Sequence, residues 1–134
     1  MIDHHSALLY TMVMVAAADA DMTDSELDKI GELVRYLPAF QGFDLNRIPE
    51  VTRACSALLQ DEDGLDKALD QIRDGLPRKL KETAYAVACD VAATNAHISQ
   101  EVLRLLEMIR HRLEIDRLVA AAIERGARAR HATA

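Results

Sequence analysis

The sequence has few aromatic residues and few residues that break regular structure. Its 134 residues include no Trp, three Tyr and two Phe, together with only five Gly and three Pro. An all-β chain needs many turns, and a surface that stacks on nucleic-acid bases needs aromatic rings. The composition therefore argues against an all-β fold and gives no sign of a base-stacking surface.

Basic charge and long apolar runs are scarce as well. Lys and Arg number 16 against 22 Asp and Glu, which gives a formal net charge of −6. A general nucleic-acid binder normally carries a basic face, so we expect no nucleic-acid partner. The longest apolar run, residues 12–18, stops at Asp19, whereas a bilayer span needs roughly 18–20 residues. We therefore expect no transmembrane segment, and the start Met-Ile-Asp-His-His lacks the basic region of a signal peptide.

The residues needed for catalysis are not arranged in a familiar pattern. Cys55 and Cys89 have no metal-type spacing, so we expect two buried free thiols in a cytoplasmic protein. The sequence contains no Gly-rich phosphate loop, no nucleophile elbow and no clear Cys-His or Ser-His-Asp arrangement. It therefore predicts no catalytic residues and a protein that is not an enzyme.

Helical periodicity runs through nearly the whole chain. Apolar residues three and four apart predict seven helices, over about residues 5–18, 24–37, 47–59, 62–75, 78–94, 100–113 and 117–125. The expected fold class is all-α, with a single domain at residues 1–126 and a flexible tail at 127–134. Expected N-caps are Asp3, Thr23, Ser99 and Asp116, and Glu26 completes a capping box with Thr23. The second helix is expected to bury Leu27, Ile30, Val34 and Leu37.

An internal repeat relates two helix–break–helix segments that lie 76 residues apart. Residues 15–17 match residues 91–93, Asp19 falls on Asn95, and Thr23 falls on Ser99. Duplicated units of this kind often pack about a pseudo-twofold axis, which would bring the two breaks near each other. The sequence therefore predicts two pseudo-symmetric helix–loop–helix repeats with a helical pair between them.

The first break carries the residues that best suit a metal site. Asp19, Asp21 and Glu26 surround one helix–helix junction, and such carboxylates can converge on a hard cation such as Ca²⁺ or Mg²⁺. The segment is similar to the start of an EF-hand loop, but Asp24 stands where that loop has Gly and Ile30 where it has Glu. The alternative is that these carboxylates serve only as helix caps and soluble turn residues.

Asp90 is the fourth principal metal candidate, and three further residues are lesser ones. Asp90 lies inside a helix, where its charge must face solvent, form a pair, or turn inward to share a site with the loops. The second break offers Asn95, His97 and Glu101, of which His97 suits a transition metal. A solvated side chain is the alternative reading for each.

A basic cluster, defined as Arg78, Lys79 and Lys81, lies at the start of the fifth predicted helix. This is the unfavourable end of a helix for cations. The cluster indicates either an acidic or anionic interaction partner or a solvated helix face.

Two segments together resemble the TerB family of tellurite-resistance proteins. Residues 17–27, Ala-Ala-Asp-Ala-Asp-Met-Thr-Asp-Ser-Glu-Leu, are similar to that family's signature A-D-G-x-[IV]-[ST]-x-x-E. Residues 76–116, which run from Leu-Pro-Arg-Lys-Leu-Lys-Glu-Thr-Ala to Leu-Glu-Ile-Asp, resemble its pattern of an LP…LRETA helix, an acidic break and a terminal helix pair. Asp19 and Glu26 match the acids of the first signature, and Asp90 matches the acid that precedes the second. The resemblance covers residues 6–124.

The resemblance implies an all-helical fold in two related halves, in a bacterial cytoplasmic protein linked to tellurite resistance or a stress response. It implies a divalent cation held by acidic residues, for which the oxygen ligands favour Ca²⁺ or Mg²⁺ over Zn²⁺, and protein partners, some of them at the inner membrane face. Asn95 stands where the family often has Asp, Ala20 and Ala96 replace Gly, and His97 and Val102 depart from the pattern. The alternative function is a metal-free interaction module, a homodimer or a scaffold subunit of a stress or co-chaperone complex.

Overall fold

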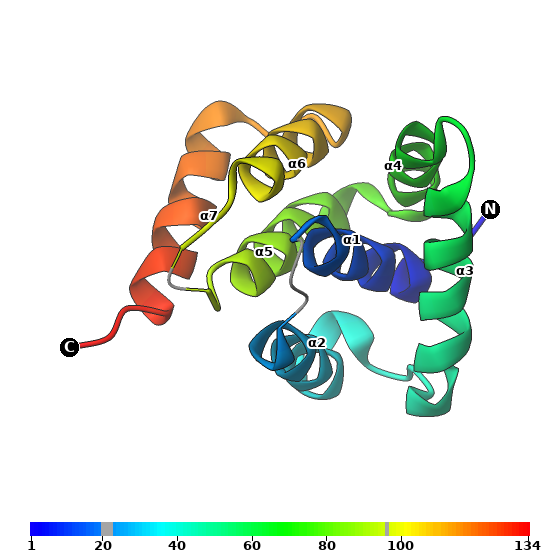
Figure 1. The fold of residues 1–134 in the computed structure, drawn as a ribbon, viewed down its shortest axis with the longest axis horizontal. Helices are drawn as coiled ribbons and strands as arrows, with labels where there is room; N and C mark the ends of the chain where they lie inside the picture. Colours follow the sequence, from blue (N-terminus) through cyan, green and yellow to red (C-terminus); the bar gives the residue numbers. More distant parts are fainter. Residues whose placement is uncertain (20–22, 96) are drawn as a thin grey trace.

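Seven α-helices and three short 3-10 turns make up the described part of the chain (Figure 1). The structure is a computed structural model that describes residues 1–19, 23–95 and 97–134, and no strand occurs in these ranges. The α-helices are α1 (His4–Ala18), α2 (Asp24–Tyr36), α3 (Ile48–Gln60), α4 (Gly64–Gly75), α5 (Lys81–Ala92), α6 (Gln100–Arg112) and α7 (Arg117–Arg130). The 3-10 turns are η1 (Pro38–Phe40), η2 (Leu45–Arg47) and η3 (Arg78–Leu80).

The first helix lies at the centre of the molecule (Figure 1). Every residue of α1 from Ser6 to Ala16 is buried. A helix that is apolar all round has to be enclosed by other elements, and α1 contacts α2, α3, α4, α5 and α6. The hydroxyl of Thr11 donates to the carbonyl of Ala7 at 2.8 Å, so this buried polar group is satisfied within the helix.

The fifth helix is the second central element. α5 packs on α1 and also contacts α2, α6 and α7. Its buried residues include Ala84, Ala88 and Ala92, and such small side chains allow neighbouring helices to approach closely. α3 and α4 pack on each other and on α1, so the expected helical pair between the two repeats is present. The all-α prediction is confirmed.

The four predicted N-caps are confirmed. The side chains of Asp3, Thr23, Ser99 and Asp116 each accept a hydrogen bond from a backbone N–H in the first turn of the following helix. Glu26 also accepts from the backbone N–H of Thr23 at 3.0 Å, which completes the capping box. Caps depend on residues at most three positions apart, so the sequence alone carries this information.

The predicted core stripe of α2 was wrong at its first position. Leu27 is 49% exposed, whereas its neighbour Glu26 is completely buried. The capping box explains the difference, because it folds the Glu26 side chain back over the start of the helix and turns Leu27 outward. Ile30 and Val34 are buried as expected, and Leu37 is half-buried.

The ends of three helices differ from the periodicity reading by two residues or more. α5 covers Lys81–Ala92 and not residues 78–94, because the 3-10 turn η3 precedes it. α7 continues to Arg130, beyond its expected end near residue 125, so the segment predicted as a tail begins as helix. Ala120 and Ala127 are both buried on α7, two turns apart, and this packing holds the helix past Gly126. α4 begins at Gly64 rather than near residue 62, because Asp63 has a left-handed backbone with φ of 59°.

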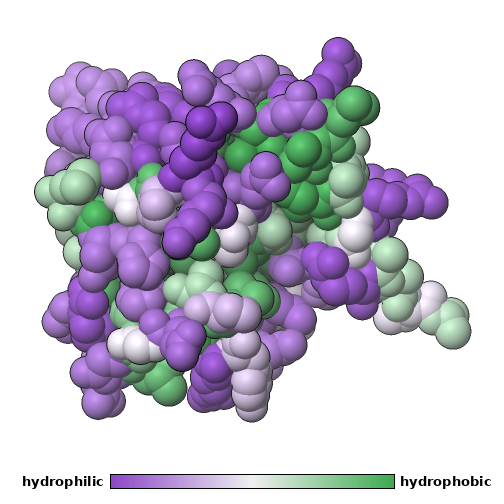
Figure 2. All heavy atoms as spheres, turned by 180° about the vertical axis from the view of Figure 1, so that it is seen from behind, coloured by the Kyte–Doolittle hydropathy of each residue, from purple (hydrophilic) through white to green (hydrophobic). Residues whose placement is uncertain are grey.

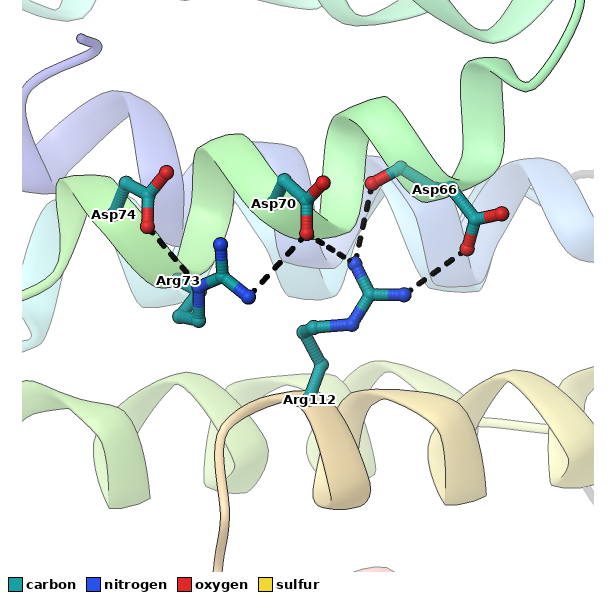
Figure 3. Close-up of polar contacts among 5 residues, drawn as sticks. All are labelled: Asp66, Asp70, Arg73, Asp74 and Arg112. Atoms are coloured by element: carbon teal, nitrogen blue, oxygen red, sulfur yellow. Dashed lines mark hydrogen bonds and ion pairs between the residues drawn. The ribbon is translucent and has the colours of Figure 1, made fainter.

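Charged side chains join α6 to α4 at the surface. The guanidinium of Arg112 donates to the carboxylates of Asp66 and Asp70 and to the backbone carbonyl of Asp66, and Arg73 contacts Asp70 and Asp74 (Figure 3). An isolated surface ion pair contributes about 0–1 kcal/mol, but a guanidinium held by several acceptors is fixed more firmly. This network joins α6, which belongs to the second repeat, to α4, which belongs to the helical pair between the repeats.

Both cysteines are buried and free, as predicted. Burial raises the pKa of the Cys55 thiol and of the Cys89 thiol to about 12 in each case. Both sulfurs are therefore protonated at neutral pH and are poor nucleophiles. Among the described residues, no helix is both long enough and apolar enough to cross a membrane.

Two glycines provide a matched test of this packing. A Cβ at Gly64 would overlap the backbone carbonyl oxygen of Leu58, whereas a Cβ at Gly31 inside α2 would meet nothing within 4 Å. We expect Gly64→Ala to lower the free energy of unfolding by about 1–3 kcal/mol, because backbone has to move. Gly31→Ala should raise it by about 0.5–1 kcal/mol through helix propensity. Urea unfolding followed by circular dichroism measures both, and a neutral Gly64→Ala would contradict the close approach.

Candidate functional site

The two interhelical breaks meet in space. The Asn95 side-chain amide donates to Oδ2 of Asp19 at 3.0 Å, and the two residues are 76 positions apart. The hydroxyl of Thr23 lies 3.3 Å from Oδ1 of Asn95, so the start of α2 joins the same contact. The expectation that the repeat brings its two breaks together is confirmed for these residues. We call Asp19, Thr23, Glu26 and Asn95 the junction cluster.

Glu26 is the most unusual member of the junction cluster. Its side chain is 0% exposed, and Oε1 accepts from both the backbone N–H of Thr23 and the Thr23 hydroxyl, at 3.0 and 3.1 Å. The other oxygen, Oε2, is buried and has no hydrogen-bond partner among the described residues. A buried carboxylate without a full set of partners is costly, so Oε2 is the atom of this site that a ligand would satisfy.

The hydroxyl of Thr23 faces more acceptors than it can serve. Its oxygen accepts from the backbone N–H of Glu26 at 3.2 Å. Its single proton can reach either Oε1 of Glu26 or Oδ1 of Asn95. One of these two oxygens is therefore left without that proton at any moment. The cluster has more acceptor oxygens than donors.

The carboxylates of the junction cluster have no basic partner among the described residues. Asp19 and Glu26 form no ion pair in the described chain. α1 and α5 both end at this junction, and neither has a basic residue in its last turn. The C-terminal end of a helix carries partial negative charge, whereas the N-terminus of α2 is already capped by Thr23. Carboxylate, amide and hydroxyl oxygens are the ligands that Ca²⁺ and Mg²⁺ prefer.

Of the four principal metal candidates, the structure brings two together. Asp19 and Glu26 lie in the junction cluster, and Asp21 lies outside the described residues. Asp90 belongs to a different contact, because its Oδ1 accepts from the guanidinium of Arg130 on α7 at 2.6 Å. The Asp90 side chain is 14% exposed. Asp90 is therefore paired with Arg130. The prediction that it turns inward to share a metal site with the loops is wrong.

Only one of the three lesser metal candidates at the second break lies in the junction cluster. Asn95 joins the junction cluster, whereas His97 and Glu101 are exposed. The position equivalent to Glu26 is Val102, which is buried and apolar, so the second repeat does not reproduce the acidic half-site. Within residues 1–19, 23–95 and 97–134, no three His, Cys, Asp or Glu side chains form a group that could hold a metal ion. Any cation here would rely on the amide and hydroxyl oxygens as well.

The basic cluster lies where it was predicted, at η3 and the first residue of α5. Arg78 and Lys79 are exposed and Lys81 is half-buried. None of the three forms an ion pair with any residue that the structure describes. Their charges remain available to a partner.

Sequence reasoning missed the contacts that α7 makes. The hydroxyl of Tyr85 on α5 donates to the carboxylate of Glu124, and burial together with this hydrogen bond raises the pKa of Tyr85. Arg130 and Asp90 form the second polar link between α5 and α7. Each pair joins residues about 40 positions apart in unrelated local patterns, so periodicity and capping signals do not reveal them.

Replacing one amide tests the contact between the breaks. Asn95→Asp removes the N–H donor and places a second carboxylate against Asp19. We expect the free energy of unfolding at pH 7, in the presence of a chelator, to fall by about 1–3 kcal/mol. The loss should shrink as the pH falls toward about 4, because protonation removes the repulsion. The exposed Asn46→Asp serves as control, and equal effects of the two substitutions would contradict the contact.

Comparison with known proteins agrees with this architecture. The family model described as "Tellurite resistance protein TerB" matches residues 5–125. No curated protein and no solved structure matches the chain. The matched range includes all of the junction cluster and nearly the whole chain. The chain therefore belongs to the TerB family.

Proposed function

We propose that this protein is a non-enzymatic module that binds a divalent cation at the junction cluster. The carrying observation is Oε2 of Glu26, a buried carboxylate oxygen without a hydrogen-bond partner among the described residues. Asp19, Asn95 and Thr23 supply further oxygens at the same junction. A hard cation is the ligand that best compensates such a set of oxygens.

The bound cation would act on the packing of the two repeats. Asp19 caps the C-terminal end of α1, Glu26 lies in the first turn of α2 and Asn95 follows α5, so one ion would hold three helix ends together. It would add to the amide contact that already joins the breaks, and no reaction step is required of it. Ca²⁺ and Mg²⁺ suit these ligands better than Zn²⁺, which prefers nitrogen and sulfur.

The biological setting that we propose follows from the family. Membership of the TerB family supports a tellurite-resistance or stress-response role in the cytoplasm of a bacterium. A module of this kind would act with protein partners, including partners at the inner membrane face.

Thermal melting tests the cation proposal directly. A ligand that binds only the folded state stabilises it by about 2.7 kcal/mol at one hundred times its Kd. We expect Ca²⁺ or Mg²⁺ at millimolar concentration to raise the Tm by several degrees, and EDTA to reverse the rise. Glu26→Gln keeps an oxygen for the capping box but removes the charge, so it should abolish the rise without unfolding the protein.

Two further variants sharpen this experiment. Asp28→Asn removes an exposed carboxylate on the same helix and should leave the rise unchanged. Asn95→Asp adds a carboxylate to the cluster, so its Tm should respond to cation more strongly than that of the original protein. The absence of a rise with Ca²⁺, Mg²⁺, Mn²⁺ and Zn²⁺ would sink the proposal, as would an unchanged rise in Glu26→Gln.

A second candidate is a metal-free interaction module, favoured by two surface features. Figure 2 shows apolar surface gathered on the side of the molecule where α7 lies, and Leu118 of α7 is 80% exposed. Contiguous apolar surface often marks a protein contact. The unpaired basic cluster would add a charge-complementary region for an acidic partner, either another subunit of a stress or co-chaperone complex or a second copy in a homodimer.

Charge reversal separates this candidate from the first. We expect the triple variant Arg78→Glu, Lys79→Glu and Lys81→Glu to lose a partner that the original protein retains in affinity capture from its host, because rim charges govern association. Lys29→Glu, at a lysine of α2 that pairs with Glu32, is the control for a single charge reversal on another helix. Identical capture by the triple variant and the original protein would contradict a role for the basic cluster.

A further inference from the structure

A groove between α5, α6 and α7 has the size of a small-molecule site. Its volume is about 740 Å³, within the range of about 300–1,000 Å³ that is usual for ligand pockets. Apolar side chains form much of its wall, among them Ala92, Ala93, Leu103, Leu106 and Ala127. Leu103 is 46% exposed, so apolar surface remains open to an occupant.

Small residues line the groove where α5 ends. Ala92 is the last residue of α5, Ala93 caps it, and Ala127 of α7 also lies on the groove wall. The Tyr85–Glu124 and Asp90–Arg130 contacts hold α7 against α5. The two helices are thus fixed by polar links, and the groove lies beside them.

Two acidic groups also line the groove. Glu124 accepts the hydroxyl hydrogen of Tyr85, which makes this carboxylate less available to a ligand. Glu107 is 69% exposed, and its Oε1 lies 3.9 Å from Nε2 of His111, beyond hydrogen-bond distance. That Nε2 accepts from the guanidinium of Arg110 at 3.0 Å instead, because a guanidinium only donates.

The basic groups are free of carboxylate partners. Arg128 forms no ion pair in the described ranges, and Arg110 contacts only the ring of His111, at 3.0 Å. His131 also lines the groove, with Nδ1 2.8 Å from the carbonyl of Ala127. Because a carbonyl only accepts, Nδ1 carries the hydrogen. An apolar wall with unpaired arginines matches a ligand that has an aliphatic body and one anionic end.

We propose that this groove binds a free aliphatic carboxylate, with its chain against the apolar wall and its carboxylate against Arg110 and Arg128. The inference does not depend on cation binding at the junction cluster. It assigns the groove to a small amphipathic anion rather than to a protein segment, because the volume is that of a ligand pocket and unpaired positive charge lines it.

Titration of the full-length protein with sodium decanoate tests the proposal. We expect saturable binding in calorimetry, with NMR amide shifts concentrated at groove residues. Decyltrimethylammonium, which has the same chain and the opposite charge, should bind at least about tenfold more weakly. Non-saturable binding, equal affinity for the two probes, or shifts concentrated around Leu118 would each overturn the proposal.

Matched variants locate the binding within the groove. Arg128→Gln should weaken decanoate binding by about tenfold, the loss expected for one charge-assisted contact. Arg125→Gln, at an exposed arginine of the same helix that does not line the groove, should leave the affinity unchanged. Equal losses in the two variants would overturn the proposal. Ala93→Phe should abolish binding by filling the space. If Ala93→Phe does not fold, the comparison of Arg128→Gln with Arg125→Gln alone decides whether the groove is the binding site.

Discussion

A helix with no polar face has to be covered on every side, and α1 is such a helix. Five other helices contact it, and their arrangement follows from that requirement. Because α1 is enclosed by other helices, polar groups of α1 can reach the surface or a site only at the two ends of the helix. Its N-terminal end is capped by Asp3, and its C-terminal end delivers Asp19 to the junction cluster. The candidate cation site is thus a consequence of how the central helix comes to an end.

Much of the fold could be predicted because its signals are local. The caps at Asp3, Thr23, Ser99 and Asp116 involve neighbours along the chain, and each was read correctly. The errors arose where tertiary packing overrides such signals. The last helix was expected to end near residue 125, yet α7 continues to Arg130, and Ala127 in this extension is buried. Exposure of Leu27 likewise follows from the burial of Glu26 beside it.

The candidate site was predictable in its position but not in its composition. The repeat raised the prospect that the two breaks lie near each other without establishing it, and the acidic signature pointed to Asp19 and Glu26. Nothing local showed that Asp90 would pair with Arg130 across two helices, or that the hydroxyl of Thr23 would reach Asn95. The groove beside α7 is still less visible in the sequence, since alanines that line a groove look the same as alanines that allow close packing.

The hydrogen bond between Asp19 and Asn95 joins equivalent positions of a duplicated unit. Two copies that both carried the acid could not form it, because neither carboxylate has a hydrogen to donate. A pair of acids would need a proton or a metal ion between them to lie so close. The Asn95 amide supplies the N–H donor that a second acid would lack, so this contact forms without either. The cation that we propose for this junction would then adjust the packing of the two halves and would not be needed for this one contact.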